Sequence, residues 1–208
     1  MKGSDYLSGL SRTKEAPAIH RLRNEAKERG VPIVNEEAAA FLRQLITLIK
    51  PARVLEIGTA IGFSSAVMAL AHQGVRIDTL ERNAQYVNEA RTNLDALGLT
   101  SRVRVHHTDG LTFTPDDDVV YDIVFIDAAK AQSVRFFERY APYVKPGGVI
   151  VADNLLFHGL VGGKAPSKDL SQLVRKIDRF NRYVLEREDF DSMIYSLGDG
   201  MSVSIKKG

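Results

Sequence analysis

The chain of 208 residues contains no cysteine. Without cysteine it can form no disulfide, no zinc site with thiolate ligands and no cysteine nucleophile. No apolar run approaches the ~20 residues that a membrane-spanning helix needs, and the N-terminal residues lack the apolar core of a secretory signal. The formal net charge of +2 does not by itself indicate a nucleic-acid-binding protein. These absences predict a cytoplasmic globular protein, and the length predicts a single domain over residues 1–208.

Short β-branched runs alternate with longer helical patterns from Arg53 onward, which is typical of a parallel sheet in an α/β protein. Two further runs flank Gly198-Asp199-Gly200 and predict an antiparallel hairpin. The core over residues 51–208 should therefore be a Rossmann-like, mostly parallel sheet of seven strands with helices on both faces, preceded by a helical segment over residues 1–50. We expect strands near residues 53–57, 75–81, 102–107, 122–126, 147–152, 192–197 and 201–205, and helices near residues 4–29, 35–50, 62–73, 83–98, 130–143 and 168–187.

Acidic side chains lie at or just after the ends of the expected parallel strands. In open α/β sheets, ligands bind beyond the carboxyl ends of the strands. Carboxylates gathered there predict a polar pocket that is rich in hydrogen-bond acceptors and has room for a metal ion. The side chains concerned are Glu56, Glu81, Asp109, Asp127 and Asp153.

The turn after the first strand carries the pattern of Glu56, Gly58 and Gly62. It lacks the Gly-x-Gly-x-x-Gly spacing with which dinucleotide-binding proteins hold a pyrophosphate, so it suits a ligand without phosphates. Glu81 is placed to accept hydrogen bonds from two ribose hydroxyls, and Asp109-Gly110 suits an amino group on a base. Together these features predict S-adenosylmethionine. The alternative is that the glycines form only a tight turn and the acids end strands in solvent.

Asp127 and the pair Asp153-Asn154 close two strands that should be neighbours. Two carboxylates, an amide oxygen and waters form an all-oxygen shell, which suits Mg²⁺ or a similar divalent cation. Lys130 follows Asp127 by three residues, and its amine could accept the proton of a substrate hydroxyl. Two alternatives remain: the Asp-Asn pair could be a turn or a helix cap, and Lys130 a solvated surface lysine.

Four segments carry a resemblance to the cation-dependent class I O-methyltransferases of the catechol and caffeoyl-CoA type: residues 55–64, 125–130, 153–154 and 198–200. The resemblance extends from about residue 31 to the C-terminus. It implies the Rossmann-like class I methyltransferase fold, with Lys130 as the base and Asp127, Asp153 and Asn154 as metal ligands. It also implies a homodimer. The S-adenosylmethionine contacts that it implies are Val34, Ser64, Glu81, Asp109, Gly110 and Asp127.

Residues 31–33, 154–161 and 174–181 carry a narrower resemblance within this family, to the bacterial enzymes that methylate 5-hydroxyuridine at the wobble position of tRNA. The hydroxyl of 5-hydroxyuracil lies beside a carbonyl oxygen, so that both oxygens could chelate one Mg²⁺, and a wobble base is already single-stranded. Basic residues could contact the anticodon loop, although such runs are usually only solvated helix faces. One stripe consists of Arg175, Arg179 and Arg182, and a second cluster consists of Arg21, Arg23, Lys27 and Arg29.

Two other functions compete with methylation of tRNA. The first is a catechol-type O-methyltransferase that acts on small molecules with the same fold and the same metal chemistry. The second is an RNA-binding module without activity, which is disfavoured because binding alone requires none of Asp127, Lys130, Asp153 and Asn154. The spacing of the glycines disfavours a nicotinamide-dependent dehydrogenase.

Overall fold

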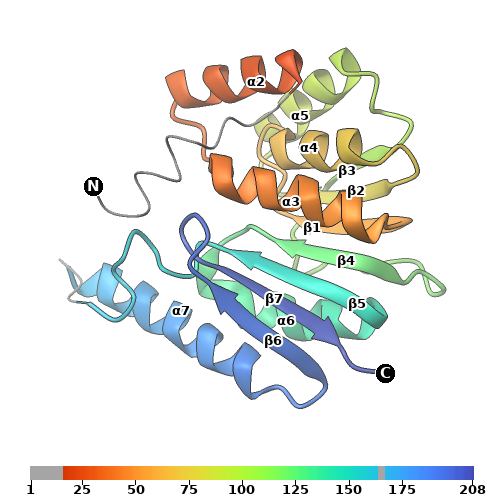
Figure 1. The fold of residues 1–208 in the computed structure, drawn as a ribbon. Helices are drawn as coiled ribbons and strands as arrows, with labels where there is room; N and C mark the ends of the chain where they lie inside the picture. Colours follow the sequence, from red (N-terminus) through yellow and green to blue (C-terminus); the bar gives the residue numbers. More distant parts are fainter. Residues whose placement is uncertain (1–15, 164–166) are drawn as a thin grey trace.

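The computed structural model describes residues 16–163 and 167–208 of the chain. A seven-stranded sheet with the order β3-β2-β1-β4-β5-β7-β6 runs through its centre (Figure 1). Within these residues no helix is long and apolar enough to cross a membrane. The strands are β1 (Arg53–Ile57), β2 (Arg76–Glu81), β3 (Val103–His107), β4 (Tyr121–Ile126), β5 (Val144–Asp153), β6 (Phe190–Tyr195) and β7 (Met201–Lys206).

Helices cover both faces of the sheet, as predicted. Figure 1 shows α2 to α5 on one side of the sheet and α6 and α7 on the other. Residues 4–15 of the first expected helix lie outside the described residues. The helices are α2 (Pro17–Glu28), α3 (Glu36–Ile49), α4 (Phe63–Ala71), α5 (Ala84–Ala96), α6 (Ser133–Tyr140) and α7 (Lys168–Glu186), with the short 3-10 helices η1 (Lys130–Gln132) and η2 (Ala141–Tyr143) before and after α6.

The pairing of the strands confirms the predicted mostly parallel sheet. β1 pairs in parallel with β2 and with β4, and the pairs β2–β3 and β4–β5 are also parallel. β7 lies antiparallel between β5 and β6, so the predicted hairpin forms one edge of the sheet. Because the strand order reverses between β1 and β4, the carboxyl ends of these two strands flank the place where such sheets bind ligands.

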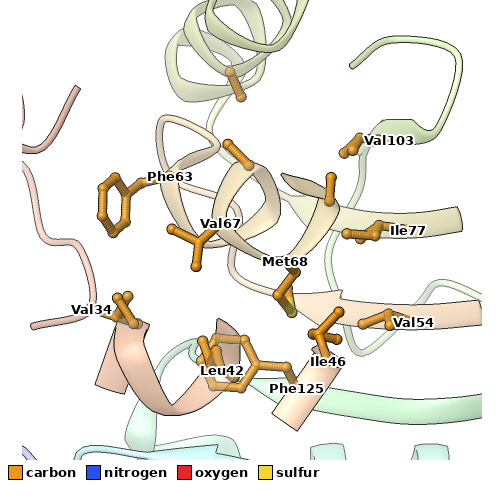
Figure 2. Packing of buried hydrophobic residues seen from close by; sticks show 14 of the residues in the cluster. Val34, Leu42, Ile46, Val54, Phe63, Val67, Met68, Ile77, Val103 and Phe125 are labelled. Carbon is orange, nitrogen blue, oxygen red and sulfur yellow. The ribbon is translucent and has the colours of Figure 1, made fainter. Parts of the chain in front are cut away.

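Apolar side chains of α3, α4 and the sheet fill one side of the core. Leu42 of α3, Met68 of α4 and Phe125 of β4 are fully buried, and Figure 2 shows them gathered between the helices and the sheet. Burying a side chain of this size contributes roughly 1.5–3 kcal/mol. α3 begins where the Asn35 side chain accepts a hydrogen bond from the Ala38 N–H at 2.9 Å. This packing holds α4, and with it the turn from β1, against the sheet.

Two elements differ from the expectation from sequence. The helix expected over residues 130–143 is divided into η1, α6 and η2. Pro142 has no N–H to donate to the helical hydrogen-bond ladder, so α6 ends ahead of it and the chain continues as the short η2. β5 begins at Val144, earlier than expected, and a register shift between Tyr121 and Ile123 of β4 accommodates the longer strand.

Candidate functional site

The turn from β1 to α4 brings the ends of three neighbouring strands together. The Gly58 N–H donates to the Leu80 carbonyl at 3.0 Å, and the Asp127 N–H donates to the Ile57 carbonyl at 2.9 Å. Gly58 has φ +102°, and a Cβ there would lie 2.0 Å from the Asp127 carbonyl oxygen. No residue with a side chain fits this position, so glycine is required for the close approach of β1 and β4. Gly62, with φ +84°, then begins α4.

Glu81 at the end of β2 is held in place by backbone groups on both sides. One carboxylate oxygen accepts a hydrogen bond from the Ala60 N–H of the glycine turn at 3.0 Å. The other accepts one from the Asn83 N–H at 2.8 Å. Each carboxylate oxygen can accept a further hydrogen bond, and the side chain is only half-buried. The geometry therefore leaves Glu81 able to bind two hydroxyls, as the predicted ribose contact requires.

Replacing Glu81 with alanine should weaken the binding of S-adenosylhomocysteine by ~1–3 kcal/mol, because two ribose hydroxyls lose their acceptor. Isothermal titration calorimetry measures this affinity, and a thermal melt confirms that the variant is folded. Glu28→Ala, which removes an exposed carboxylate of α2, is the matched control. If the folded Glu81→Ala protein binds as tightly as the control, the cofactor is not bound at Glu81.

Glu56 is fully buried beside the turn from β1 to α4. Its carboxylate accepts hydrogen bonds from the hydroxyl of Ser65 in α4 and from that of Thr79 in β2, the latter at 2.6 Å. Burial raises the pKa of Glu56 to about 7, although the hydroxyls of Ser64, Ser65 and Thr79 partly oppose this effect. The second carboxylate oxygen is buried and has no partner among the described residues. The contacts of Glu56 are thus internal, and its predicted contact with the cofactor stays a prediction.

The raised pKa of Glu56 makes stability depend on pH. The folded chain holds the Glu56 proton up to about pH 7, whereas the unfolded chain releases it near 4.5. The stabilisation is therefore complete below about pH 4.5 and is lost as the pH rises to about 7, by on the order of 3 kcal/mol. Glu56→Gln cannot ionise and should flatten this part of the profile. Urea unfolding at about pH 5 and about pH 8 measures how far the free energy of unfolding falls between these two pH values. An equal fall in the parent protein and in Glu56→Gln would contradict the assignment.

Asp109 and Gly110 form the turn after β3. One Asp109 oxygen accepts a hydrogen bond from the Leu111 N–H at 2.8 Å, and the side chain is otherwise exposed. Gly110 is tightly enclosed, because a Cβ there would lie 2.8 Å from an Ile57 methyl carbon. The Gly110 carbonyl accepts a hydrogen bond from the Tyr140 hydroxyl at 2.5 Å. The packing fixes the backbone of this turn, while the carboxylate remains open to a ligand.

Two further residues predicted to contact the cofactor lie in this part of the core. Ser64 is buried in the first turn of α4, which starts at the glycine turn. Val34 is also buried, two residues before the start of α3, and Figure 2 shows it beside Leu42 and below Phe63. Neither position has a contact that tests the prediction.

Asp127, Lys130 and Asp153 form an electrostatically coupled group at the ends of β4 and β5. The Lys130 amine lies 2.7 Å from an Asp127 carboxylate oxygen, and the Lys130 side chain is only 15% exposed. The alternative of a solvated surface lysine is therefore wrong. Asp153 is buried, and its pKa is raised to about 6, first by burial and then by the negative charge of Asp127, while Lys130 opposes the shift.

The oxygens at the end of β5 fit a hard divalent cation. One oxygen of Asp153 accepts the Asn154 N–H at 2.7 Å, and the other is buried without a partner among the described residues. Asn154 has φ +63°, so the chain does turn sharply here. The described part of the chain contains no cluster of three His, Cys, Asp or Glu residues suited to a metal. A cation at Asp127 and Asp153 therefore needs the Asn154 amide and waters as further ligands, which is the oxygen shell that Mg²⁺ accepts.

Asp199, in the turn of the C-terminal hairpin, belongs to a segment that carries the family resemblance, but the sequence assigned it no role of its own in the site. It is 13% exposed, and one carboxylate oxygen accepts the His158 N–H at 2.6 Å. Backbone hydrogen bonds join the same turn to Leu155 and Leu156, just beyond Asn154. Asp199 also acts electrostatically on Asp153. The hairpin turn thus shapes the loop after the metal-ligand pair, and the Gly-Asp-Gly motif was its only sequence signal.

The structure corrects one of the two basic clusters. Arg23 is 4% exposed, and its guanidinium lies 4.7 Å from the centre of the Phe63 ring, so it packs in the core and is not available to phosphates. Arg21 is exposed on α2. On α7, Arg175, Arg179 and Arg182 are all exposed, but Arg182 pairs with an aspartate one turn away. The α7 stripe remains a surface to which phosphates have access.

Comparisons with known proteins indicate the family and the fold of this chain. A family profile described as O-methyltransferase matches residues 10–207. A catechol O-methyltransferase from Niastella koreensis is 30% identical over 214 residues, which cover 97% of this chain and 95% of that protein.

Two solved structures resemble the whole chain. A candidate caffeoyl-CoA O-methyltransferase from Staphylococcus aureus is 35% identical with a TM-score of 0.91, and the match covers 97% of this chain and 98% of that one. The O-methyltransferase TomG from Streptomyces achromogenes, which was solved in complex with S-adenosylmethionine, is 27% identical with a TM-score of 0.81. That match covers 98% of this chain and 95% of TomG.

Proposed function

The chain belongs to the O-methyltransferase family, as an S-adenosylmethionine-dependent enzyme of the catechol and caffeoyl-CoA type, and we propose that it methylates a small molecule with two neighbouring hydroxyls. One observation carries the proposal: Asp127, Lys130 and the buried Asp153 are coupled at the ends of β4 and β5. Glu81 is held on the other side of the glycine turn. This order along the sheet supports a cofactor site next to an all-oxygen cation site.

In this proposal the cofactor lies across the carboxyl ends of the sheet. Glu81 would accept hydrogen bonds from the ribose hydroxyls, and Asp109 would accept one from the amino group of the base. Gly58 adds no side-chain atoms to the cofactor site, and no other residue can replace it because a Cβ there would collide with the Asp127 carbonyl. Asp127 and Lys130 would then face the methyl group that the cofactor supplies.

The reaction needs a deprotonated substrate oxygen that faces this methyl group. Lys130 in its neutral form takes the hydroxyl proton on its amine nitrogen, and Asp127, 2.7 Å away, orients that amine. The substrate oxygen forms a bond to the methyl carbon while the carbon–sulfur bond breaks and its electron pair stays on sulfur. Asp127, Asp153 and Asn154 would hold a divalent cation, which would supply charge stabilisation and orient two neighbouring oxygens.

A direct comparison of two substrates tests the choice of small molecule. We expect the purified enzyme with Mg²⁺ to methylate 3,4-dihydroxybenzoate and related catechols, with kcat/KM higher than for unmethylated tRNA that carries 5-hydroxyuridine. Catechols offer the same pair of adjacent oxygens without requiring a large contact surface. A kcat/KM that is far higher for tRNA, and that falls steeply with salt as phosphate contacts predict, would overturn this choice.

Methylation of 5-hydroxyuridine in the tRNA anticodon loop is the second candidate. It is favoured by the exposed α7 arginines and by the narrower resemblance of the sequence, whereas the relatives reported above bear names of the catechol and caffeoyl-CoA type. If tRNA is the substrate, charge reversal at Arg175 and Arg179 should weaken tRNA binding and leave the affinity for S-adenosylhomocysteine unchanged. Unchanged tRNA binding in that variant would remove α7 from the interface.

We also propose that the chain forms a homodimer, as the family resemblance implies. The C-terminal hairpin supports this proposal, because Met193, Tyr195 and Ile205 are 57%, 48% and 44% exposed on neighbouring strands. A second copy would cover this apolar surface. Light scattering should give twice the mass of 23.0 kDa; a monomer at micromolar concentration would contradict the proposal.

A further inference from the structure

A cavity of about 770 Å³ is lined by the sheet face that also carries α6 and α7, and it extends past the edge strand β3 to Arg91 and Leu94 of α5. It opens over β1, β2 and β3, and no residue of α6 or α7 lines it. Part of its wall comes from the segment between β3 and β4, including Phe113, Thr114 and Pro115. The cavity reaches the starts of the strands, the ends opposite to Glu81 and Asp127. It is therefore separate from the proposed active site.

Strand alternation places a charged cluster on the wall of this cavity. Arg53 of β1 lies opposite Arg76 of β2, and Asp78 of β2 lies opposite Arg104 of β3. Residues two apart on a strand share a face, so Arg76 and Asp78 point the same way. His106 follows Arg104 on that face. The parallel register thus brings three arginines from three strands to one side of the sheet.

The negative charge of Asp78 is already engaged within the protein. One of its oxygens lies 2.7 Å from His106 Nε2, and the other accepts a hydrogen bond from the buried Tyr121 hydroxyl at 3.4 Å. Burial, and then Asp78, raise the pKa of Tyr121, so the phenol keeps its proton. The polar floor of the cavity thus consists of Asp78, His106 and Tyr121, whose side chains already have hydrogen-bond partners in one another. They do not require the neighbouring arginines as partners.

The guanidinium groups around this floor are free to bind. Arg53, Arg76 and Arg104 are exposed, and none of their side chains forms a hydrogen bond or an ion pair within residues 16–163 and 167–208. Two further lining arginines, Arg91 and Arg102, instead donate to backbone carbonyls. Five arginines against two aspartates leave the cavity wall strongly positive.

We propose that this cavity binds a small phosphate-bearing anion of about the size of a nucleoside diphosphate. Arginine presents a planar fork of donors that matches phosphate oxygens, and three such side chains without internal partners line this cavity. The volume is within the ~300–1,000 Å³ of ordinary ligand pockets and exceeds what a single phosphate fills. Phe113, whose ring centre lies 4.9 Å from that of His106, adds an apolar wall for the remainder of the ligand.

Calorimetric titration with ADP and, separately, with inorganic pyrophosphate tests the proposal. Both titrations use the full chain without metal and with excess S-adenosylhomocysteine, so that adenosine cannot enter the proposed cofactor site. We expect saturable binding of ADP that Arg53→Ala/Arg76→Ala weakens by about 10-fold or more, because two charge-assisted contacts are lost. Equal binding of pyrophosphate would still support the site and would assign the affinity to the phosphates alone.

Arg175→Ala/Arg179→Ala is the matched control, since it removes two exposed arginines from α7 and leaves the cavity intact. It should bind ADP as the parent protein does, and thermal melts should show that both variants are folded. The ¹⁵N resonance of the His106 ring should shift with pyrophosphate in the parent protein. Absence of saturable binding for both probes, or equal weakening in the α7 control, would overturn the proposal.

Discussion

Replacing Lys130 with alanine should lower kcat by ~10²–10⁴-fold and change KM little, because the amine acts only as the proton is transferred. The affinity for S-adenosylhomocysteine should not change. The loss should become smaller as the pH rises, since more substrate then arrives already deprotonated. Stopped assays of methyl transfer between about pH 7 and about pH 9 measure this dependence.

Lys130→Arg separates the base from the ion pair. Arginine preserves a positive charge that can pair with Asp127, but it stays protonated and accepts no proton. It should therefore be nearly as inactive as Lys130→Ala. Lys27→Ala, an exposed lysine on α2, is the control and should retain full activity. Wild-type kcat in Lys130→Arg would remove Lys130 from proton transfer.

Removing the cation, or its buried ligand Asp153, should abolish turnover. Asp153 is 1% exposed and one of its oxygens has no partner among the described residues, so a cation would complete its coordination. EDTA should stop the reaction and Mg²⁺ or Mn²⁺ should restore it. Asp153→Asn should lose Mn²⁺ binding, measured by electron paramagnetic resonance, and lose turnover, while S-adenosylhomocysteine still binds.

Asp191→Asn is a suitable control for Asp153→Asn, because it makes the same change on an exposed position of β6. It should bind Mn²⁺ and turn over substrate as the parent protein does. The cation assignment would be contradicted if Asp153→Asn kept both properties, or if the parent protein worked at full rate in EDTA.

The strand-end acids could be found from the sequence because the topology of a parallel sheet brings them together. Once β1, β2, β4 and β5 are recognised, Glu81, Asp127 and Asp153 must lie at one edge of the sheet. Lys130 follows from its three-residue distance to Asp127. Spacing along the sequence does not show how far Lys130 is buried or what it contacts. In the structure its side chain is largely buried and its amine forms a salt bridge with Asp127.

Other features depend on which neighbour a side chain meets, and the sequence does not specify this. Arg23 belongs to a basic run, but it packs on Phe63, which lies forty residues further along the chain. The cluster of Arg53, Arg76 and Arg104 depends on the register of three strands, and strand boundaries from sequence are uncertain by ~2–4 residues. A shift of one residue would turn such side chains to the opposite face.

We expect the chain to methylate a hydroxyl whose neighbouring oxygen shares a cation held by Asp127, Asp153 and Asn154. Mass spectrometry of products from 3,4-dihydroxybenzoate and 3-hydroxybenzoate, with S-adenosylmethionine and Mg²⁺, tests it most directly. We expect one added methyl group on the dihydroxy compound, none on the monohydroxy compound, and no product at all with EDTA. Equal methylation of both compounds, in the presence of EDTA, would contradict it.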